Sequence, residues 1–228
     1  MIETIFLDLD NTILDFSMAE RKALTFTLES LGIEPKEWVL QRYSQINLAQ
    51  WKLLEQGKLT RDEVKLRRFR LLFEEMGVER TDKEAARIYE DRLAQGHYFM
   101  EGAEKLLETL HGKYRMFIVT NGTASVQAGR LKSADIGKYF ENIFISEEVG
   151  HNKPGKEYFD CCFAEISGFN KDTAVIIGDS LTSDIQGGIN AGIRSIWFNP
   201  GHEAADGRII PDYETDSLSK IPALLAEI

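Results

Sequence analysis

Acidic side chains follow the first apolar run of the chain. Residues 2–7 read IETIFL, a short β-branched and aromatic run that favours a buried strand, and Asp8 and Asp10 come directly after it. Side chains two apart on a strand point to the same face, and a bend after Leu9 would redirect the second carboxylate. A divalent cation such as Mg²⁺ would offset the repulsion between the two acids. A solvated acidic turn that closes the strand explains the same residues, so the rest of the chain must decide.

Strands and helices alternate in the second half of the chain. Short apolar runs predict strands at residues 115–120, 142–146, 174–178 and 194–198, with helical patterns of about ten residues between them. Such alternation implies right-handed crossovers and a mostly parallel sheet. The predicted fold class is therefore α/β, with a Rossmann-like parallel sheet as its core.

Polar residues collect where these predicted strands end. Thr120 and Asn121 end one strand, Lys153 follows the next, and Asp179 and Asp184 follow another. Ligands of open parallel sheets bind beyond the carboxyl ends of the strands, where carboxylates could hold Mg²⁺ and a hydroxyl, backbone N–H groups and an ammonium could hold a phosphoryl group. Taken singly, the threonine is common in strands, the lysine suits a surface loop, and the acids suit a helix start. Their joint placement at successive strand ends favours one site.

A helical insert separates the first strand from the others. Helical patterns run from Ser17 to Gln95, and Thr60-x-x-Glu63 and Thr81-x-x-Glu84 each match a capping box, the sequence signature of a helix start. No convincing strand lies among them, which indicates a separate helical domain. The predicted domains are a catalytic core and a helical cap, at residues 1–14 with 99–228 and at residues 15–98 respectively.

Charge and composition limit the partners. The chain has 228 residues and a formal net charge of −10, which argues against binding a nucleic-acid polymer or an anionic membrane surface. No signal peptide opens the chain, and no apolar run approaches the roughly eighteen residues that a membrane span needs. We therefore expect a cytoplasmic protein with a small-molecule substrate. Cys161 and Cys162 are neighbours in an apolar helical pattern and are expected to be core residues.

The four polar segments resemble the motifs of the haloacid dehalogenase (HAD) superfamily of phosphohydrolases. Order and spacing agree over essentially the whole chain, and the insert resembles the helical cap of that family. The segments are Phe6-Leu7-Asp8-Leu9-Asp10-Asn11-Thr12, Ile118-Val119-Thr120-Asn121-Gly122, Lys153-Pro154 and Gly178-Asp179-Ser180-Leu181-Thr182-Ser183-Asp184.

This resemblance implies a role for each residue. Asp8 would be the nucleophile that forms an aspartyl-phosphate, and Asp10 the general acid and base. The implied phosphate-binding residues are Thr120, Asn121 and Lys153. The implied Mg²⁺ ligands are Asp8, Asp179 and Asp10, the last through its carbonyl, and Asp184 would lie behind them or bind through water.

A narrower resemblance concerns the substrate. The segments 145–150 and 183–192, and Gln127 and Arg130 after the Thr120 motif, resemble bacterial pyrimidine 5′-nucleotidases. A sugar-phosphate or glycolate-phosphate phosphatase and a phosphomutase stay open, as does a non-enzyme, a phospho-acceptor or binding module. Asp10 argues against a dehalogenase, because a halide leaves without a proton. We expect a small phosphomonoester as substrate, and a monomer or a homodimer.

Overall fold

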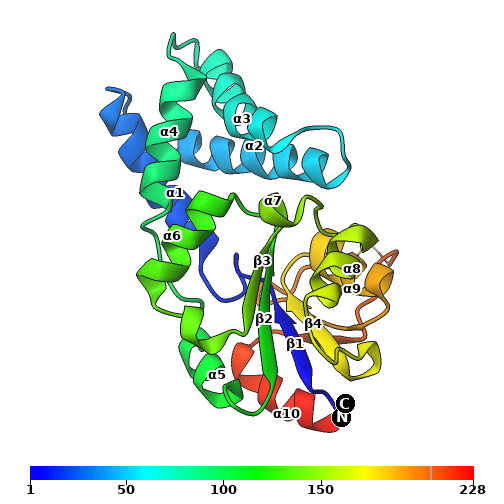
Figure 1. Ribbon diagram of the computed structural model, residues 1–228. Coiled ribbons are helices and arrows are strands. Elements are labelled where there is room, and N and C mark those ends of the chain that lie inside the picture. The colour runs from blue at the N-terminus through cyan, green and yellow to red at the C-terminus, as the bar shows by residue number, and fades with distance from the viewer. Residues whose placement is uncertain (206) are drawn as a thin grey trace. The chain divides into compact units, whose positions relative to one another are not determined.

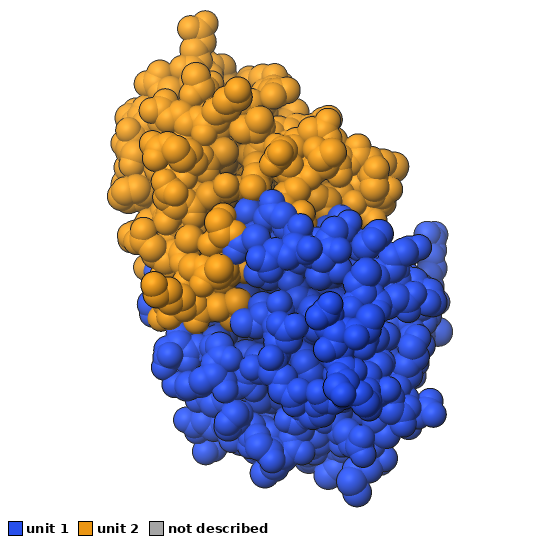
Figure 2. Space-filling model, viewed as in Figure 1, with its two compact units in different colours: residues 1–15, 97–124, 134–228 blue, residues 16–96, 125–133 orange. Residues whose placement is uncertain are grey.

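The chain folds into two compact units (Figure 2). The computed structural model describes residues 1–205 and 207–228. Unit 1 comprises Met1–Asp15, His97–Ala124 and Ala134–Ile228, and unit 2 comprises Phe16–Gly96 and Ser125–Ser133. Unit 2 thus includes residues 125–133, which the sequence-based division left with the core.

A parallel sheet forms the centre of unit 1 (Figure 1). In the described residues it has six strands in the order β3-β2-β1-β4-β5-β6, and every neighbouring pair is parallel. The predicted α/β fold with a parallel sheet is therefore confirmed. The last strand was not predicted, because it is only three residues long and has one buried side chain. The strands are β1 (Thr4–Leu7), β2 (Arg115–Thr120), β3 (Asn142–Ile145), β4 (Ala174–Gly178), β5 (Arg194–Phe198) and β6 (Tyr213–Thr215).

Helices cover both faces of this sheet. In Figure 1, α8 (Lys156–Ala164) and α9 (Gln186–Ala191) lie on one side, and α5 (Ala103–Leu110) and α10 (Ile221–Glu227) lie on the other. The rings of Phe6 and Phe163 meet at 5.5 Å between the sheet and α8. The other helical segments are α7 (Ser146–Val149), a π turn at Leu181–Ile185, and 3₁₀ turns at Gly137–Tyr139, Lys171–Thr173 and Leu218–Lys220. Burial on both faces explains why the central strands are apolar throughout.

Unit 2 is helical. Its elements are α1 (Phe16–Ser30), α2 (Glu37–Glu55), α3 (Arg61–Met76), α4 (Asp82–Leu93) and most of α6 (Ala124–Ala134). The rings of Tyr43, Phe69 and Tyr89 pack together in its core, at 5.0 to 5.6 Å. No helix in the described residues has the length and apolar character to cross a bilayer.

The two predicted capping boxes have different outcomes. Thr60 and Glu63 form both reciprocal hydrogen bonds at the start of α3, so that prediction is confirmed. Thr81 does precede α4, but its side chain makes no capping hydrogen bond, so the second box is wrong. The carboxylate of Asp82, in the first turn of α4, is instead held by Arg70 at 2.9 Å.

Candidate active site

Asp8 lies one residue beyond β1, at the centre of the sheet. Its N–H donates to the Ile177 carbonyl at 2.9 Å, so the backbone pairing with β4 continues past the end of the strand. The chain then turns, because the N–H groups of Ile13 and Leu14 both donate to the Leu9 carbonyl. The turn brings the Thr12 hydroxyl to 3.4 Å from Asp8 Oδ2. Strand and turn together fix the Asp8 carboxylate, and the side chain is only 9% exposed.

Lys153 is buried against Asp8. Its Nζ donates to Asp8 Oδ1, Asp184 Oδ1 and the Val119 carbonyl, each at 2.7 Å, which uses all three N–H donors of the ammonium. Burial opposes the charged form, but the carboxylates of Asp184 and Asp8 outweigh it and raise the pKa of Lys153. The surface-loop explanation of this lysine is therefore wrong, since its side chain is 1% exposed.

Asn121 joins the β2 loop to the Lys153 segment. Its Nδ2 donates to the Lys153 carbonyl at 2.9 Å, and its Oδ1 accepts from the Lys153 N–H at 2.8 Å. The hydroxyl of the buried Thr120 accepts from the Gly122 N–H at 3.2 Å. These bonds hold the Thr120 loop beside the lysine that contacts Asp8.

Asp179 and Asp184, the acids that follow β4, lie close to Asp8. Asp184 is 1% exposed, and its Oδ2 accepts from the Ser180 N–H at 3.1 Å. A Cβ at Gly178 would lie 2.3 Å from Asp184 Cγ, so only glycine leaves room for this carboxylate. The indole N–H of Trp197 donates to the Asp179 carbonyl at 2.7 Å and fixes the segment.

Three carboxylates are close enough to share a cation. Asp8, Asp179 and Asp184 each offer an oxygen within 4.8 Å of the others. Burial raises the pKa of Asp8 to about 7; the Lys153 ammonium opposes the rise, and the charges of Asp184 and Asp10 add to it. Burial, followed by the charges of Asp8 and Asp184, also raises the pKa of Asp179. The single positive charge of Lys153 therefore does not balance the negative charges of these carboxylates. The carboxylates offer hard oxygen donors, which fit Mg²⁺.

The observed cluster differs from the predicted ligands in one member. Asp184, which was expected to lie behind the metal, belongs to the cluster of carboxylates. Asp10 was expected to bind Mg²⁺ through its backbone carbonyl, and a cluster made up of side-chain oxygens does not include that atom. Its carboxylate is near enough to raise the pKa of both Asp8 and Asp179. The structure thus brings all four predicted acids into one electrostatic group.

Two supporting residues had no predicted role. Thr12 belongs to the first motif, and the signal for it was its spacing of four residues from Asp8, which a turn closes. Trp197 is the penultimate residue of β5 and lies eighteen residues after Asp179, whose carbonyl it holds. No local pattern in the sequence signals that contact, because it is the pairing of β5 with β4 that brings the two residues together.

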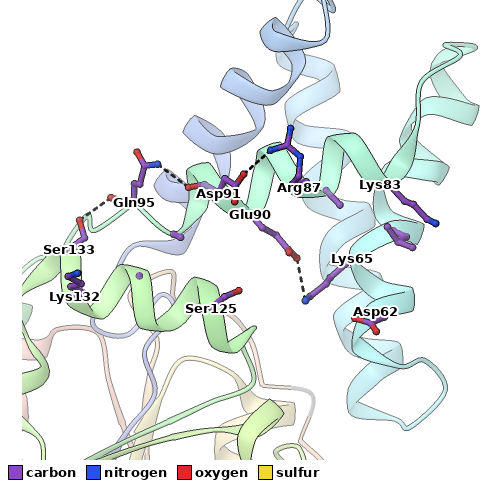
Figure 3. Close-up of a pocket in the computed structure, with 14 residues that line it drawn as sticks. Asp62, Lys65, Lys83, Arg87, Glu90, Asp91, Gln95, Ser125, Lys132 and Ser133 are labelled. Atoms are coloured by element: carbon purple, nitrogen blue, oxygen red, sulfur yellow. Dashed lines mark hydrogen bonds and ion pairs between the residues drawn. The ribbon is translucent and has the colours of Figure 1, made fainter.

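A separate hollow lies within unit 2 (Figure 3). It has a volume of about 980 Å³ and is lined by residues of α3, α4 and α6 and by Ala94 and Gln95, which follow α4. Several of its charges are paired, including Lys65 with Glu90 at 3.9 Å and Arg87 with Asp91 at 3.2 Å. None of the predicted site residues lines it. The hollow is therefore distinct from the carboxylate site in unit 1.

The match to a known family covers most of the chain. Residues 5–198 match the family model described as haloacid dehalogenase-like hydrolase. The chain belongs to this family. The predicted superfamily and the prediction of an enzyme, a hydrolase, are therefore confirmed. The catalytic and binding roles of single residues stay predictions.

Three bacterial relatives are similar over nearly their full length. The HAD-hydrolase YfnB of Bacillus subtilis is 39% identical over 222 residues, 97% of this chain and 94% of YfnB. A crystal structure of YfnB bound to magnesium has a TM-score of 0.94 and covers 98% of both chains. The pyrimidine 5′-nucleotidase PynA of Streptococcus pneumoniae is 39% identical over 93% of this chain and 90% of its own length. The pyrimidine 5′-nucleotidase YjjG of Escherichia coli is 30% identical over 98% and 97%.

Proposed function

We propose that this hydrolase removes phosphate from pyrimidine nucleoside 5′-monophosphates through an aspartyl-phosphate on Asp8, with Mg²⁺ as cofactor. The observation that carries the proposal is the buried contact of Lys153 with Asp8, beyond the end of the central strand. Two relatives that are pyrimidine 5′-nucleotidases, at 39% and 30% identity, support the substrate class. Magnesium in the structure of YfnB and the cluster of three carboxylates in this chain support the cofactor.

The two acids of the first motif divide the chemistry. An Asp8 oxygen attacks phosphorus, and the bond from phosphorus to the 5′ oxygen breaks while Asp10 gives that oxygen its proton. Asp10 then takes a proton from water, whose oxygen attacks phosphorus and releases inorganic phosphate and free Asp8. Covalent catalysis replaces one difficult displacement with two easier ones, and the second acid serves both.

The other polar residues prepare the site for a dianion. Lys153 keeps Asp8 oriented and offsets its charge, because it holds that carboxylate at 2.7 Å. A phosphoryl oxygen would share or exchange one of the three hydrogen bonds that Lys153 makes. Thr120 ends β2 and Asn121 begins the loop after it, and both would bind the remaining oxygens. Bound Mg²⁺ would supply the charge neutralisation that lets a carboxylate approach a phosphomonoester.

Unit 1 holds every residue of the proposed site. We accordingly assign it as the catalytic core and unit 2 as the cap. Substrate choice would then depend on residues 16–96 and 125–133, which lie outside the four motifs.

Trapping the phosphoenzyme tests this proposal. In Asp10→Asn, turnover of a nucleotide should fall by about 10²–10⁴-fold, because no general acid protonates the 5′ oxygen. With p-nitrophenyl phosphate the leaving group needs no proton, so the phosphorylated protein should accumulate and be seen by mass spectrometry after an acid quench.

Variants of Asp8 are the matched control for this experiment. Asp8→Asn and Asp8→Ala should give no phosphorylated species, because the attacking oxygen is altered or absent. Near-normal turnover by Asp8→Ala would show that water attacks phosphorus directly, and the covalent mechanism would have to be given up.

A further inference from the structure

Glu147 contacts the helix that follows the proposed phosphate loop. Residues 121–123 connect β2, which ends at Thr120, to α6, whose first residue is Ala124. Glu147 lies in α7, directly after β3, which pairs with β2 in the sheet. Its Oε2 accepts a hydrogen bond from the Ala124 N–H at 2.6 Å. A carboxylate from the short helix after the neighbouring strand thus reaches the end of the loop.

The first N–H groups of a helix attract anions. They have no partner within the helix, and the helix dipole places partial positive charge at this end. A phosphate group could use the same N–H groups, since helix starts are common phosphate sites. In this chain Glu147 already occupies the N–H of Ala124.

The loop is therefore held at both ends. At its start, Asn121 exchanges two hydrogen bonds with the backbone of Lys153. At its end, Ala124 is held by Glu147. Between them lie Gly122 and Thr123, whose backbone and hydroxyl groups could meet a phosphoryl oxygen. Fixing both ends lowers the cost of ordering such a loop around a ligand.

We propose that Glu147 is a positioning residue for phosphate binding. Through the Ala124 N–H it fixes the loop after β2, and it directs the phosphoryl group to Thr120, Asn121 and Lys153 instead of the start of α6. This inference rests on the proposed function and names no contact between Glu147 and the substrate.

The neighbouring acid provides a matched control. Glu148 is also exposed and lies in the same short helix, but its side chain makes no hydrogen bond or ion pair with the described residues. We compare Glu147→Ala, Glu147→Gln and Glu148→Ala with the unaltered enzyme. The measurements are kcat and KM for p-nitrophenyl phosphate, the inhibition constant of inorganic phosphate, and the melting temperature.

Glu147→Ala should raise KM and the inhibition constant of phosphate by about tenfold, the scale of a lost helix-capping bond, with a smaller change in kcat. Glu147→Gln should recover most of this loss, because its amide oxygen can accept the same hydrogen bond. Glu148→Ala should match the unaltered enzyme. A merely structural role would lower the melting temperature and leave KM and phosphate inhibition of the folded enzyme unchanged.

Two results would overturn the inference. One is unchanged KM and phosphate inhibition in Glu147→Ala, and the other is an equal loss in the Gln and Ala variants. Failure of the proposed function is a different outcome, in which the unaltered enzyme hydrolyses no phosphomonoester. Calorimetric titration with inorganic phosphate in Mg²⁺ buffer would still compare the variants in that case.

Discussion

The Lys153 ammonium contacts two carboxylates and a backbone carbonyl at the end of the sheet, all at 2.7 Å. A buried ion pair is costly to form, and removing one partner is strongly destabilising because it leaves an unpaired charge. Such a group is retained where its geometry has a use. Here the geometry holds Asp8, on which the proposed reaction takes place.

A substitution at Gly178 tests how strongly turnover depends on the position of Asp184. An added Cβ would lie 2.3 Å from Asp184 Cγ, so Gly178→Ala must push this carboxylate away from Lys153. A misplacement of about 1 Å at a catalytic group can cost about 10²-fold in rate, and we expect a fall in kcat of that order. Steady-state kinetics on p-nitrophenyl phosphate measures it.

Gly137→Ala is the matched control for Gly178→Ala. A Cβ at Gly137 meets nothing within 4 Å, so turnover should be unchanged. If the folded Gly178→Ala variant kept normal turnover, the contact between Asp184 and Lys153 would not contribute to catalysis.

At the scale of residues, sequence reasoning found the polar groups but not their burial. Asp8, Thr120 and Asp179 stand at the ends of apolar runs, so their types and spacing predict one site. Lys153 follows no strand directly, and a lysine before a proline suits a surface loop. Only the tertiary structure shows that its side chain runs inward to Asp8.

At the scale of elements, α6 has an unusual place. Its first residue belongs to unit 1 and most of the others to unit 2. Gly129 allows close approach, since a Cβ there would lie 2.7 Å from the Ala94 carbonyl oxygen. Arg130 is fully buried and donates to the Gly96 carbonyl and to Gln127 Oε1, both at 3.1 Å. The helix after the proposed phosphate loop is thus tied to the end of the helical insert.

Arg130→Met should destabilise the protein. The substitution keeps an unbranched apolar side chain but removes the donors of the Gly96 carbonyl and Gln127. Removing the donor of the buried Gly96 carbonyl costs about 1–3 kcal/mol, so we expect a loss of that order in the free energy of unfolding. Urea denaturation followed by circular dichroism measures this loss.

Lys132→Met on the same helix is the control. Lys132 is exposed, and surface substitutions usually stay within about 0.5 kcal/mol. Equal stability of the two variants would contradict the role given to Arg130 in holding α6.

Sequence patterns predicted most elements, and the exceptions have physical reasons. Long periodic helices and buried strands give strong signals, whereas β6 has three residues and α7 has four. Gln127 and Arg130 were noticed only through a resemblance. Their place in unit 2 depends on a contact with Gly96, more than thirty residues earlier in the chain, and local periodicity cannot reveal such a contact.

At the scale of the whole molecule, Mg²⁺ should stabilise the folded protein. A ligand that binds only the folded state at 100 times its Kd adds about 2.7 kcal/mol. Thermal melting in EDTA and in Mg²⁺, at equal ionic strength, should therefore show a higher melting temperature with the metal. Asp179→Asn should lose most of this difference. EDTA should also abolish turnover, and full activity in metal-free buffer would contradict the proposed cofactor.

Substrate choice is a property that the acids and the lysine of unit 1 leave undetermined. Its acids and Lys153 would act on the phosphoryl group of any phosphomonoester, so selection among leaving groups must come from other residues. Similarity to PynA and YjjG extends over more than 90% of this chain, and therefore includes unit 2. We accordingly expect kcat/KM for dUMP or dTMP to exceed that for glucose, glycerol and glycolate phosphates. The measurement is initial rates of phosphate release at matched concentrations. A sugar phosphate that leads by tenfold, about 1.4 kcal/mol of transition-state binding, would reject the nucleotidase proposal and leave the phosphatase mechanism standing.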